Sequence, residues 1–309
     1  MSATLAPLVV IAGPTASGKS SLALKLALRF GGEIISCDSV AVYREFEIGT
    51  AKPSLEERKR VPHHLIDVVA PDAYFTAGEY ARRAREAARQ ITARGKLPIV
   101  CGGTGLYLRA MLDGLFAGPE RDEALRDRLR RHRRPGALWR LLRRLDPQAA
   151  LRIHANDEPK LIRAIEVCVA SSRPMTELLR EGRDALSGYR TLHIGLSPER
   201  ALLYDHIDRR CSAMFELGLV EETSALLARY GPDGFAMRSL GYRQAAEHLR
   251  GECTVAEALS RMQQGHRNYA KRQLTWFRRE PEMRWLNLFG QQAFAPATEI
   301  VQQFLSRTQ

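Results

Sequence analysis

Short apolar runs that each end in a polar or glycine-rich loop mark the first third of the chain. Residues 8–12, 33–37 and 97–101 are rich in aliphatic side chains, as is typical of parallel strands that are buried on both faces. Residues 21–30 repeat apolar positions at helical spacing and end at two glycines. Strand, helix and strand at these distances predict a parallel sheet with right-handed crossovers.

Capping patterns and alternation predict further elements along the chain. Thr76 and Thr254, each followed three residues later by a glutamate, have the spacing of a capping box that begins a helix. Residues 189–196 alternate apolar and polar positions and predict a strand that returns to the sheet. A long helix follows, with its cap expected at 197–198 and its end at Gly218.

The loop after the first strand carries the most specific motif in the chain. Residues 13–20 read G-x-x-x-x-G-K-S and lie between a predicted strand and a predicted helix. Backbone N–H groups of such a P-loop surround a phosphate at the positive end of a helix, the lysine neutralises a terminal phosphate, and the serine holds Mg²⁺. The expected pyrophosphate-binding residues are Gly13, Pro14, Thr15, Ala16, Ser17, Gly18, Lys19 and Ser20, with Ser20 as the metal ligand.

A change of composition predicts the domain organisation. From about residue 120 to 182 the pattern is helical, rich in arginine and poor in β-branched runs. We therefore expect an α/β fold, in which a P-loop NTPase-like core with a parallel sheet is interrupted by an inserted helical domain. The expected parts are 1–119 for the first part of the core, 120–186 for the insertion and 187–309 for the second part with the C-terminal helices.

The net charge of +12 in 309 residues is concentrated in two windows. Window 121–144 has ten arginines and three acidic residues, and window 261–284 has seven basic and two acidic residues. Such clusters indicate a polyanionic partner, but they are also common on solvated helix faces, and the charge alone does not decide between the two. An anionic membrane surface is a weaker third interpretation, because the first window has an apolar stripe of Leu125, Leu129, Leu138 and Leu142, but Pro135-Gly136 is expected to interrupt it.

Composition excludes several other classes of protein. No apolar run approaches the roughly 18 residues of a membrane-spanning helix, and there is no secretory signal pattern. The five cysteines lie far apart in sequence, which argues against a redox pair, a zinc knuckle or a disulfide framework. The histidines lack a metal-binding pattern, since His63 and His64 are adjacent and would point apart on a strand. We expect buried, reduced thiols in a cytoplasmic protein without a membrane partner.

Asp38 and Thr104 each follow a predicted strand, so both are expected at the carboxyl edge of the sheet beside the P-loop. Asp38 is a candidate metal-orienting acid, a candidate general base, or a helix cap together with Ser39; position alone does not separate the first two roles. The glycines around Thr104 allow close backbone approach, or they form an ordinary turn. Arg210 either belongs to a surface ion-pair cluster or reaches the phosphate site.

Aromatic and cationic residues alternate along 268–278. Tyr269 and Trp276 could stack on bases while Lys271, Arg272 and Arg278 contact phosphates. The alternative is that the aromatic residues form the buried face of an amphipathic helix. The spacing favours burial for two of the three aromatic residues (Tyr269, Trp276 and Phe277), and it leaves the cations available in either case.

Several of these motifs, taken together and in order, resemble the tRNA dimethylallyltransferase (isopentenylpyrophosphate transferase) family. The resemblance runs from residue 8 to about 285, nearly the whole chain. It is carried by residues 13–20, by Asp38-Ser39 with Tyr43, by 48–53, 63–67, 102–107 and 161–167, by Gly241-Tyr242 and by 269–278.

The resemblance implies transfer of a dimethylallyl group from dimethylallyl diphosphate to N6 of the adenosine 3′ to the anticodon, with Mg²⁺ as cofactor. It implies that the P-loop holds the donor's diphosphate, that Asp38 is the general base, that Thr104 contacts the reacting region and that Arg210 clamps the diphosphate. The implied partner is a tRNA anticodon stem-loop, and the protein is expected to act as a monomer. The implied tRNA-binding residues are Asp38, Ser39, Val40, Ala41, Thr104, Arg126, Lys160, Ile162, Arg163, Glu166, Arg238, Gly241, Tyr242, Arg243, Lys271, Arg272, Gln273, Trp276 and Arg278.

The sequence departs from the family pattern at two positions. Ala41 stands where the family often has a glutamine that hydrogen-bonds the adenine, so base recognition must come from elsewhere, such as Ser39 or backbone groups. Lys160 stands where an arginine is common, which keeps the charge but loses the bidentate fork.

Three other functions compete with this interpretation. The P-loop and Asp38 also fit a small-molecule or nucleoside kinase, although such an enzyme does not need the two cationic windows. An isopentenyltransferase acting on free adenine nucleotides is disfavoured by the arginine-rich insertion. An RNA-binding protein switched by a nucleoside triphosphate would bind without any transfer chemistry.

Overall fold

The computed structural model describes residues 5–131 and 134–306. The chain forms two compact units, one made of Met1–Met111 with Ser187–Gln309 and the other of Leu112–Leu186. The second boundary coincides with the expected one. The first lies at residue 111 rather than 119.

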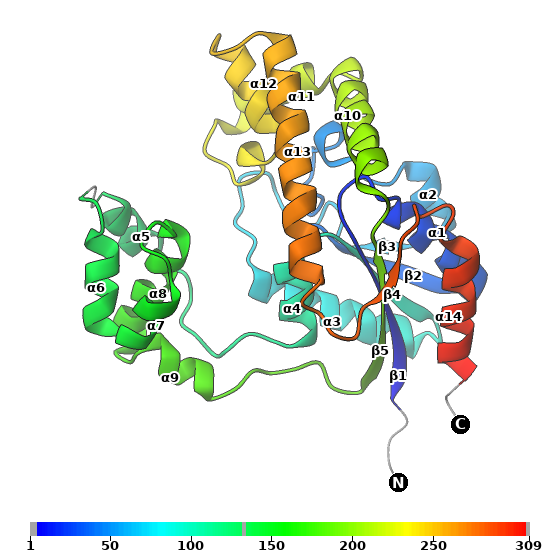
Figure 1. The fold of residues 1–309 in the computed structure, drawn as a ribbon, viewed down its shortest axis with the longest axis horizontal. Coiled ribbons are helices and arrows are strands. Elements are labelled where there is room, and N and C mark those ends of the chain that lie inside the picture. Colours follow the sequence, from blue (N-terminus) through cyan, green and yellow to red (C-terminus); the bar gives the residue numbers. More distant parts are fainter. Residues whose placement is uncertain (1–4, 132–133, 307–309) are drawn as a thin grey trace. The chain divides into compact units, whose positions relative to one another are not determined.

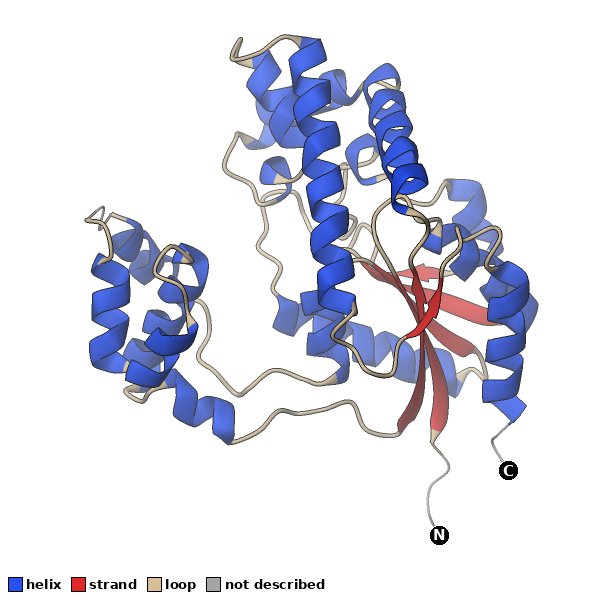
Figure 2. Ribbon diagram, in the orientation of Figure 1, coloured by secondary structure: helices blue, strands red, loops and turns tan. Residues whose placement is uncertain are grey.

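The larger unit is built on a six-stranded parallel sheet with the order β3-β2-β4-β1-β5-β6 (Figure 2). Its four long strands match the sequence-based prediction closely, whereas the short strands at the two edges, β3 and β6, were not predicted. In the middle of the sheet, Val10 pairs with Val100 on one side and with His193 on the other. The strands are β1 (Ala6–Ala12), β2 (Gly32–Cys37), β3 (His63–His64), β4 (Leu97–Gly102), β5 (Tyr189–Leu196) and β6 (Arg284–Leu286).

Helices cover the sheet and extend beyond its carboxyl edge (Figure 1). The capping box at Thr254 is confirmed in full, whereas at Thr76 only the threonine half is present. The long helix after β5 is capped by Glu199 and not by residues 197–198. The helices of this unit are α1 (Lys19–Phe30), η1 (Ile48–Thr50), α2 (Leu55–Arg60), α3 (Ala77–Ala93), α4 (Gly105–Leu112), α10 (Arg200–Glu216), α11 (Leu219–Tyr230), η2 (Ala236–Arg238), α12 (Tyr242–Leu249), α13 (Val255–Phe277) and α14 (Phe294–Ser306).

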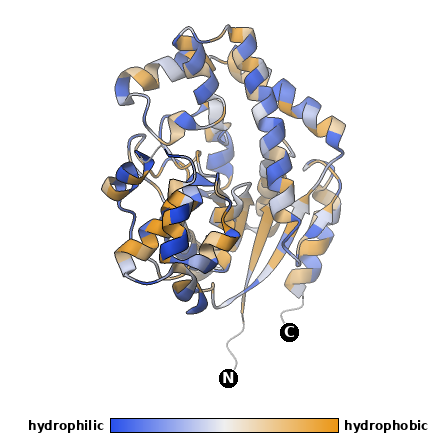
Figure 3. Cartoon of the chain, turned by 60° about the vertical axis from the view of Figure 1, so that its left-hand side comes forward, coloured by the Kyte–Doolittle hydropathy of each residue, from blue (hydrophilic) through white to orange (hydrophobic). Residues whose placement is uncertain are grey.

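Alternation along the strands sends side chains to opposite faces of the sheet. Val9 and Ile11 of β1 belong to one apolar cluster with side chains of α1 and α14, while α3 packs against β2 and β4. The long strands that can be seen in Figure 3 are mostly hydrophobic, and the surrounding helices are mixed. This two-sided burial fixes the strand ends, and therefore the loops at the carboxyl edge, in place.

The described residues of the smaller unit form five helices around its own apolar cluster. The expected break at Pro135-Gly136 is confirmed, because Gly136 has a φ of 69° and begins a new helix. Leu125, Leu129 and Leu142 of the predicted apolar stripe are buried in this cluster, so the stripe is a core and not a membrane face. The helices are α5 (Glu123–Arg130), α6 (Ala137–Leu145), α7 (Pro147–Arg152), α8 (Glu158–Ser171) and α9 (Met175–Arg180).

Three observations at this level bear on the expectations from the sequence. None of the helices that the structure describes is long and apolar enough to cross a membrane. The cysteines are free thiols; Cys253 is partly exposed and the other four are buried. Arg133, one of the arginines of window 121–144, lies outside the described residues.

Candidate active site

The loop of residues 13–20 joins β1 to α1 in the conformation that its motif predicts. Gly18 adopts the left-handed conformation with φ 81° and begins α1, and Ala16 has φ 61°. The backbone of Gly290 packs so closely on Gly18 that a side-chain carbon there would lie 2.8 Å from its nitrogen. The N–H of Gly290 also donates to the carbonyl of Ser17 at 2.9 Å. The backbone of Gly290 therefore holds the loop in place, and the loop presents the first turn of α1.

Two cations lie together at this loop. Lys19 Nζ donates to the carbonyl of Pro14 at 3.1 Å, and Arg210 Nη1 of α10 donates to Thr15 Oγ1 at 2.6 Å. Burial lowers the pKa of both groups, and the charge of Arg210 lowers the pKa of Lys19 further. Neither cation forms an ion pair with a carboxylate in the part of the chain that the structure describes. Such a site favours a multiply charged anion.

Asp38 and Thr104 lie at the ends of neighbouring strands, as predicted. Asp38 Oδ1 accepts hydrogen bonds from the N–H groups of Val40 at 2.8 Å and Ala41 at 3.1 Å. Thr104 Oγ1 accepts from the N–H of Ser39 at 3.2 Å, and its own N–H donates to the carbonyl of Cys37. Asp38 caps a turn and not a helix, so the helix-cap interpretation is wrong.

Asp38 lies near enough to the phosphate loop to act on the two cations there. Its carboxylate raises the pKa of Lys19 and of Arg210 against the effect of burial. Burial and then the charge of Asp38 raise the pKa of Tyr269 in α13 to about 12, with a hydrogen bond to Thr104 opposing the rise. A carboxylate, a threonine hydroxyl and two cations therefore share one site at the carboxyl edge of the sheet.

The buried side of α13 closes this site. Gln273, only 5% exposed, accepts from the N–H of Thr15 at 2.8 Å and donates to the carbonyl of Gly103 at 3.0 Å. The ring of Trp276 lies against Gly105, where an added side-chain carbon would be 2.2 Å from Nε1. Gln273 is therefore an internal bridge in this structure, and its contact with tRNA stays a prediction.

The other side of α13 carries the cations. Arg109 of α4 stacks on Trp276, with its guanidinium carbon 4.5 Å from the ring centre, and Arg272 stacks on Tyr269. Phe277 alone of the three aromatic residues is fully buried, so the expectation that two would be core residues is wrong. A hollow of about 540 Å³ opens on this side and is lined by Asn268, Lys271, Arg272, Thr275, Trp276 and Arg279. Arg278 is exposed at the end of the helix.

Tyr242, another of the predicted tRNA-binding residues, makes its hydrogen bonds inside the protein. It is fully buried, and its hydroxyl accepts from the N–H of Gly49 at 3.1 Å and donates to Glu222. Gly241, with φ 95°, is the residue that begins α12. Arg238 and Arg243 nearby are exposed and remain candidates.

Sequence reasoning missed the role of Lys52. Its side chain is 1% exposed and donates to the carbonyl of Tyr43 at 2.8 Å, to Glu47 at 3.0 Å and to Asp67 at 2.5 Å. It thereby joins two of the motifs, 48–53 and 63–67, into one structure. The signal available was the lysine inside a run of otherwise uncharged residues, but nothing local indicates its partners.

In the smaller unit, three predicted tRNA-binding residues form a buried ion cluster. Glu166 is 0% exposed and accepts from Arg126 at 2.7 Å, from Arg163 at 2.6 Å and from the N–H of Asp122 at 2.9 Å. Ile162 is 3% exposed. Glu166 and Ile162 are therefore core residues of this unit, and their contact with tRNA stays a prediction. Lys160 is exposed and pairs with Asp157.

We expect Glu166→Gln to destabilise this unit by about 3 kcal/mol near pH 7, because two arginines would be left without a buried partner. Burial alone raises the pKa of Glu166, but hydrogen bonds from Arg126 and Arg163 outweigh it and lower the pKa to about 2. This stabilisation is present above the ordinary pKa of 4.5 and disappears as the pH falls towards 2. Urea unfolding followed by circular dichroism measures both effects.

The matched control for this prediction is Glu177→Gln. Glu177 lies in the same unit, but it is exposed and pairs with Arg173 on the surface, so its replacement should cost about 0–1 kcal/mol. Equal destabilisation by the two variants would contradict a special role for the buried cluster.

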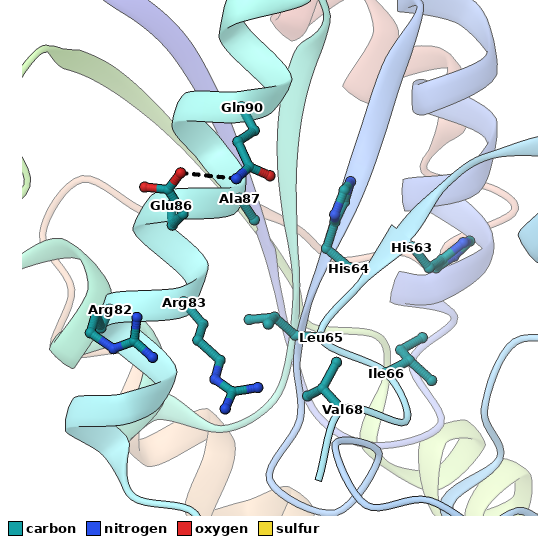
Figure 4. A pocket seen from close by; sticks show the side chains of 10 residues that line it. All are labelled: His63, His64, Leu65, Ile66, Val68, Arg82, Arg83, Glu86, Ala87 and Gln90. Atoms are coloured by element: carbon teal, nitrogen blue, oxygen red, sulfur yellow. Dashed lines mark hydrogen bonds between the residues drawn. The ribbon is translucent and has the colours of Figure 1, made fainter.

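A separate pocket of about 350 Å³ lies between β3 and α3 and is shown in Figure 4. His63 and His64 border it on one side, and Arg82 and Arg83 of α3 border it on the other. None of the residues predicted for catalysis or for phosphate binding lines this pocket. His64 is engaged by Glu33, with 2.7 Å between Nε2 and Oε2.

Comparison with known proteins adds an independent finding. Residues 41–280 match the family model described as IPP transferase. A tRNA dimethylallyltransferase of Koribacter versatilis is 65% identical over 93% of this chain and 94% of that protein, and one of Geobacter sulfurreducens is 46% identical over 90% and 91%.

Solved structures give the same picture. The tRNA isopentenylpyrophosphate transferase of Bacillus halodurans has a TM-score of 0.73 at 36% identity, covering 98% of this chain and 97% of that one. A eukaryotic dimethylallyltransferase, described as acting on tRNA, has a TM-score of 0.83 at 26% identity and covers 97% and 80%.

Proposed function

Because this chain belongs to the IPP transferase family, we propose that it transfers a dimethylallyl group from dimethylallyl diphosphate to N6 of the adenosine 3′ to the anticodon of tRNA. The observation that carries this proposal is the meeting of Lys19, Arg210 and Asp38 at the carboxyl edge of the sheet. The two cations suit a diphosphate, and the carboxylate suits the proton of an attacking amine. A tRNA substrate agrees with the names of the relatives and with the tRNA-acting structural neighbour.

In the proposed reaction, N6 of the adenosine forms a bond to the allylic carbon while the bond from that carbon to the diphosphate oxygen breaks. The electron pair leaves with the diphosphate, whose charge is stabilised by Lys19, Arg210 and the first turn of α1. The proton of N6 passes to Asp38, whose carboxylate is oriented by two backbone N–H groups. Thr104 lies on the neighbouring strand end and borders the reacting atoms.

The turn after Asp38 also bears on how the adenine is recognised. Because the N–H groups of Val40 and Ala41 already donate to Asp38, they are not available to the base. The Ser39 N–H is likewise taken by Thr104. We therefore assign the reading of the base edge on this turn to the hydroxyl of Ser39, in place of the missing glutamine at position 41.

The protein oxygen atoms at this site fit Mg²⁺ if the substrate supplies some of the metal's ligands. Among the residues that the structure describes, no three His, Cys, Asp or Glu side chains lie together as a metal cluster. Mg²⁺ is usually held by a few protein oxygens together with substrate phosphates and waters. Ser20 in the first turn of α1 would supply its hydroxyl, and the ion would neutralise charge on the leaving diphosphate.

The proposal includes an anticodon stem-loop as partner and the exposed cations as its contacts. These cations are Lys271, Arg272 and Arg278 of the α13 segment, Arg238 and Arg243 near α12, and Lys160 of α8. The buried free thiols agree with a reducing cytoplasm as the place of action. The enzyme is proposed to act as a monomer.

Removing two of these cations should weaken tRNA binding in a salt-dependent way. For Lys271→Ala combined with Arg272→Ala, we expect the slope of log affinity against log salt to fall by up to about 0.7 for each single-strand phosphate that the variant no longer neutralises. Filter binding of tRNA at several salt concentrations measures this slope.

The matched control is Lys59→Ala with Arg60→Ala, a second pair of adjacent exposed cations on α2. Its slope should remain that of the wild type. An unchanged slope in the α13 variant would mean that those cations form only a solvated helix face.

One assay separates the proposed function from its competitors. Undermodified tRNA and labelled dimethylallyl diphosphate should give labelled tRNA with this protein. The assay is then repeated with AMP as acceptor and with labelled ATP as donor. Label in AMP but not in tRNA would indicate an enzyme of free nucleotides. Phosphate transfer from ATP would indicate a kinase, and RNA binding without any transfer would indicate a binding protein.

A further inference from the structure

Gln273 connects two loops that are far apart in the sequence. Its Oε1 accepts the N–H of Thr15 in the phosphate loop, and its Nε2 donates to the carbonyl of Gly103 just before Thr104. Both hydrogen bonds are buried, and the side chain is 5% exposed. An added side-chain carbon at Gly103 would lie 2.1 Å from Nε2, so glycine is required there for this close approach.

The bridge places one amide between the two halves of the proposed reaction. On one side lies Thr15, whose hydroxyl accepts from Arg210 at the diphosphate site. On the other side lies the turn carrying Thr104, which in turn binds the Ser39 N–H next to Asp38. An amide donates and accepts in fixed directions, so it sets the spacing of both loops at once.

The bridge also belongs to α13, the helix that carries the exposed cations Lys271 and Arg272. Gln273 follows them directly in sequence but lies on the buried side of the same helix. A shift of α13 on binding RNA would therefore move the amide that spaces the two loops.

We propose that Gln273 is a positioning residue, which fixes the phosphate loop against the Thr104 turn and links tRNA seated on α13 to the geometry of the donor site. This inference rests on the proposed function, because Gln273 would position the prenyl donor relative to the adenosine that accepts the prenyl group. It predicts a defect in catalysis and in donor binding, with tRNA affinity retained.

The test compares Gln273→Met, which fills the same space without polar groups, with Gln273→Asn, which keeps an amide that is too short for both partners. We expect each to lower kcat and to raise the KM for dimethylallyl diphosphate, with kcat/KM reduced about tenfold or more because a buried donor and a buried acceptor are left without partners. The affinity for tRNA should stay within about twofold. Gln264→Ala, on the exposed side of α13, is the matched control and should behave as the wild type.

A second readout does not depend on transfer to tRNA. Inorganic pyrophosphate should raise the melting temperature of the wild-type protein and of Gln264→Ala more than that of either Gln273 variant. If the Met variant fails to fold, the Asn variant decides the outcome.

Two results would overturn the positioning role. One is weaker tRNA binding with an unchanged donor KM, which would make Gln273 an RNA contact after all. The other is wild-type kinetics and an undiminished response to pyrophosphate in the variants. Should the wild-type enzyme itself fail to modify tRNA, the proposed function falls, while the response to pyrophosphate still tests the bridge.

Discussion

Replacing Asp38 by asparagine is expected to reduce dimethylallyl transfer by about 10²–10⁴-fold, the usual contribution of a general base. The asparagine carbonyl still accepts the N–H groups of Val40 and Ala41, so the turn keeps its conformation. What disappears is the group that takes the proton from N6. Single-turnover assays with saturating tRNA and donor measure the chemical step.

The alanine variant at the same position is the companion experiment. Asp38→Ala removes both the base and the acceptor of two hydrogen bonds, so it should lose stability as well as activity. The affinity of the asparagine variant for tRNA should remain close to that of the wild type. A large loss of tRNA binding in the asparagine variant, or a normal rate, would contradict the assignment of Asp38 as the base.

The elements that the sequence predicted well are those whose environment is uniform along the chain. A central parallel strand such as β1 or β4 is buried on both faces, so its apolar run is continuous and visible. The edge strand β3 has only two residues, His63 and His64, and its pairing to β2 comes from a distant part of the chain. No local pattern distinguishes such a segment from a loop.

The site shows the same division between local and distant information. The phosphate loop and Asp38 were predicted because their chemistry depends on a spacing or on a strand end. The burial of Tyr242 depends on interactions with Gly49 and Glu222, and Gln273 reaches a loop 258 residues away. The resemblance named both residues as tRNA-binding, but it could not indicate these internal contacts.

The charge excess also divides into two kinds once the partners of each cation are known. In the inserted unit, Arg126 of the first cationic window and Arg163 from outside it neutralise the buried Glu166, so part of that window serves folding. In α13, Lys271 and Arg272 form no ion pair among the described residues. Lys271 and Arg272 are therefore the cations of the second window that we expect to meet a polyanionic partner.

Replacing Lys19 by methionine should weaken donor binding about 100-fold or more, because a diphosphate in a partly buried site would lose a charged partner worth about 3 kcal/mol. The effect should depend on pH. Burial and the charge of Arg210 hold the pKa of Lys19 below its ordinary value in the free protein. Bound diphosphate favours the protonated amine and raises that pKa again.

The sign of this pH dependence follows from the two pKa values. The affinity for diphosphate is highest below the pKa that Lys19 has in the free protein, because the amine is already protonated there. The affinity falls as the pH rises through that pKa. Calorimetry with inorganic pyrophosphate from about pH 7 to about pH 10 should show this fall in the wild type, together with proton uptake at the alkaline end.

Lys19→Met should bind pyrophosphate weakly, and its affinity should lack the part of the pH dependence that comes from Lys19. Lys25→Met, further along α1 and against Phe294, should reproduce the wild-type curve. If Lys19→Met gave the same affinity and pH dependence as the wild type, Arg210 and the helix terminus would hold the diphosphate without the lysine.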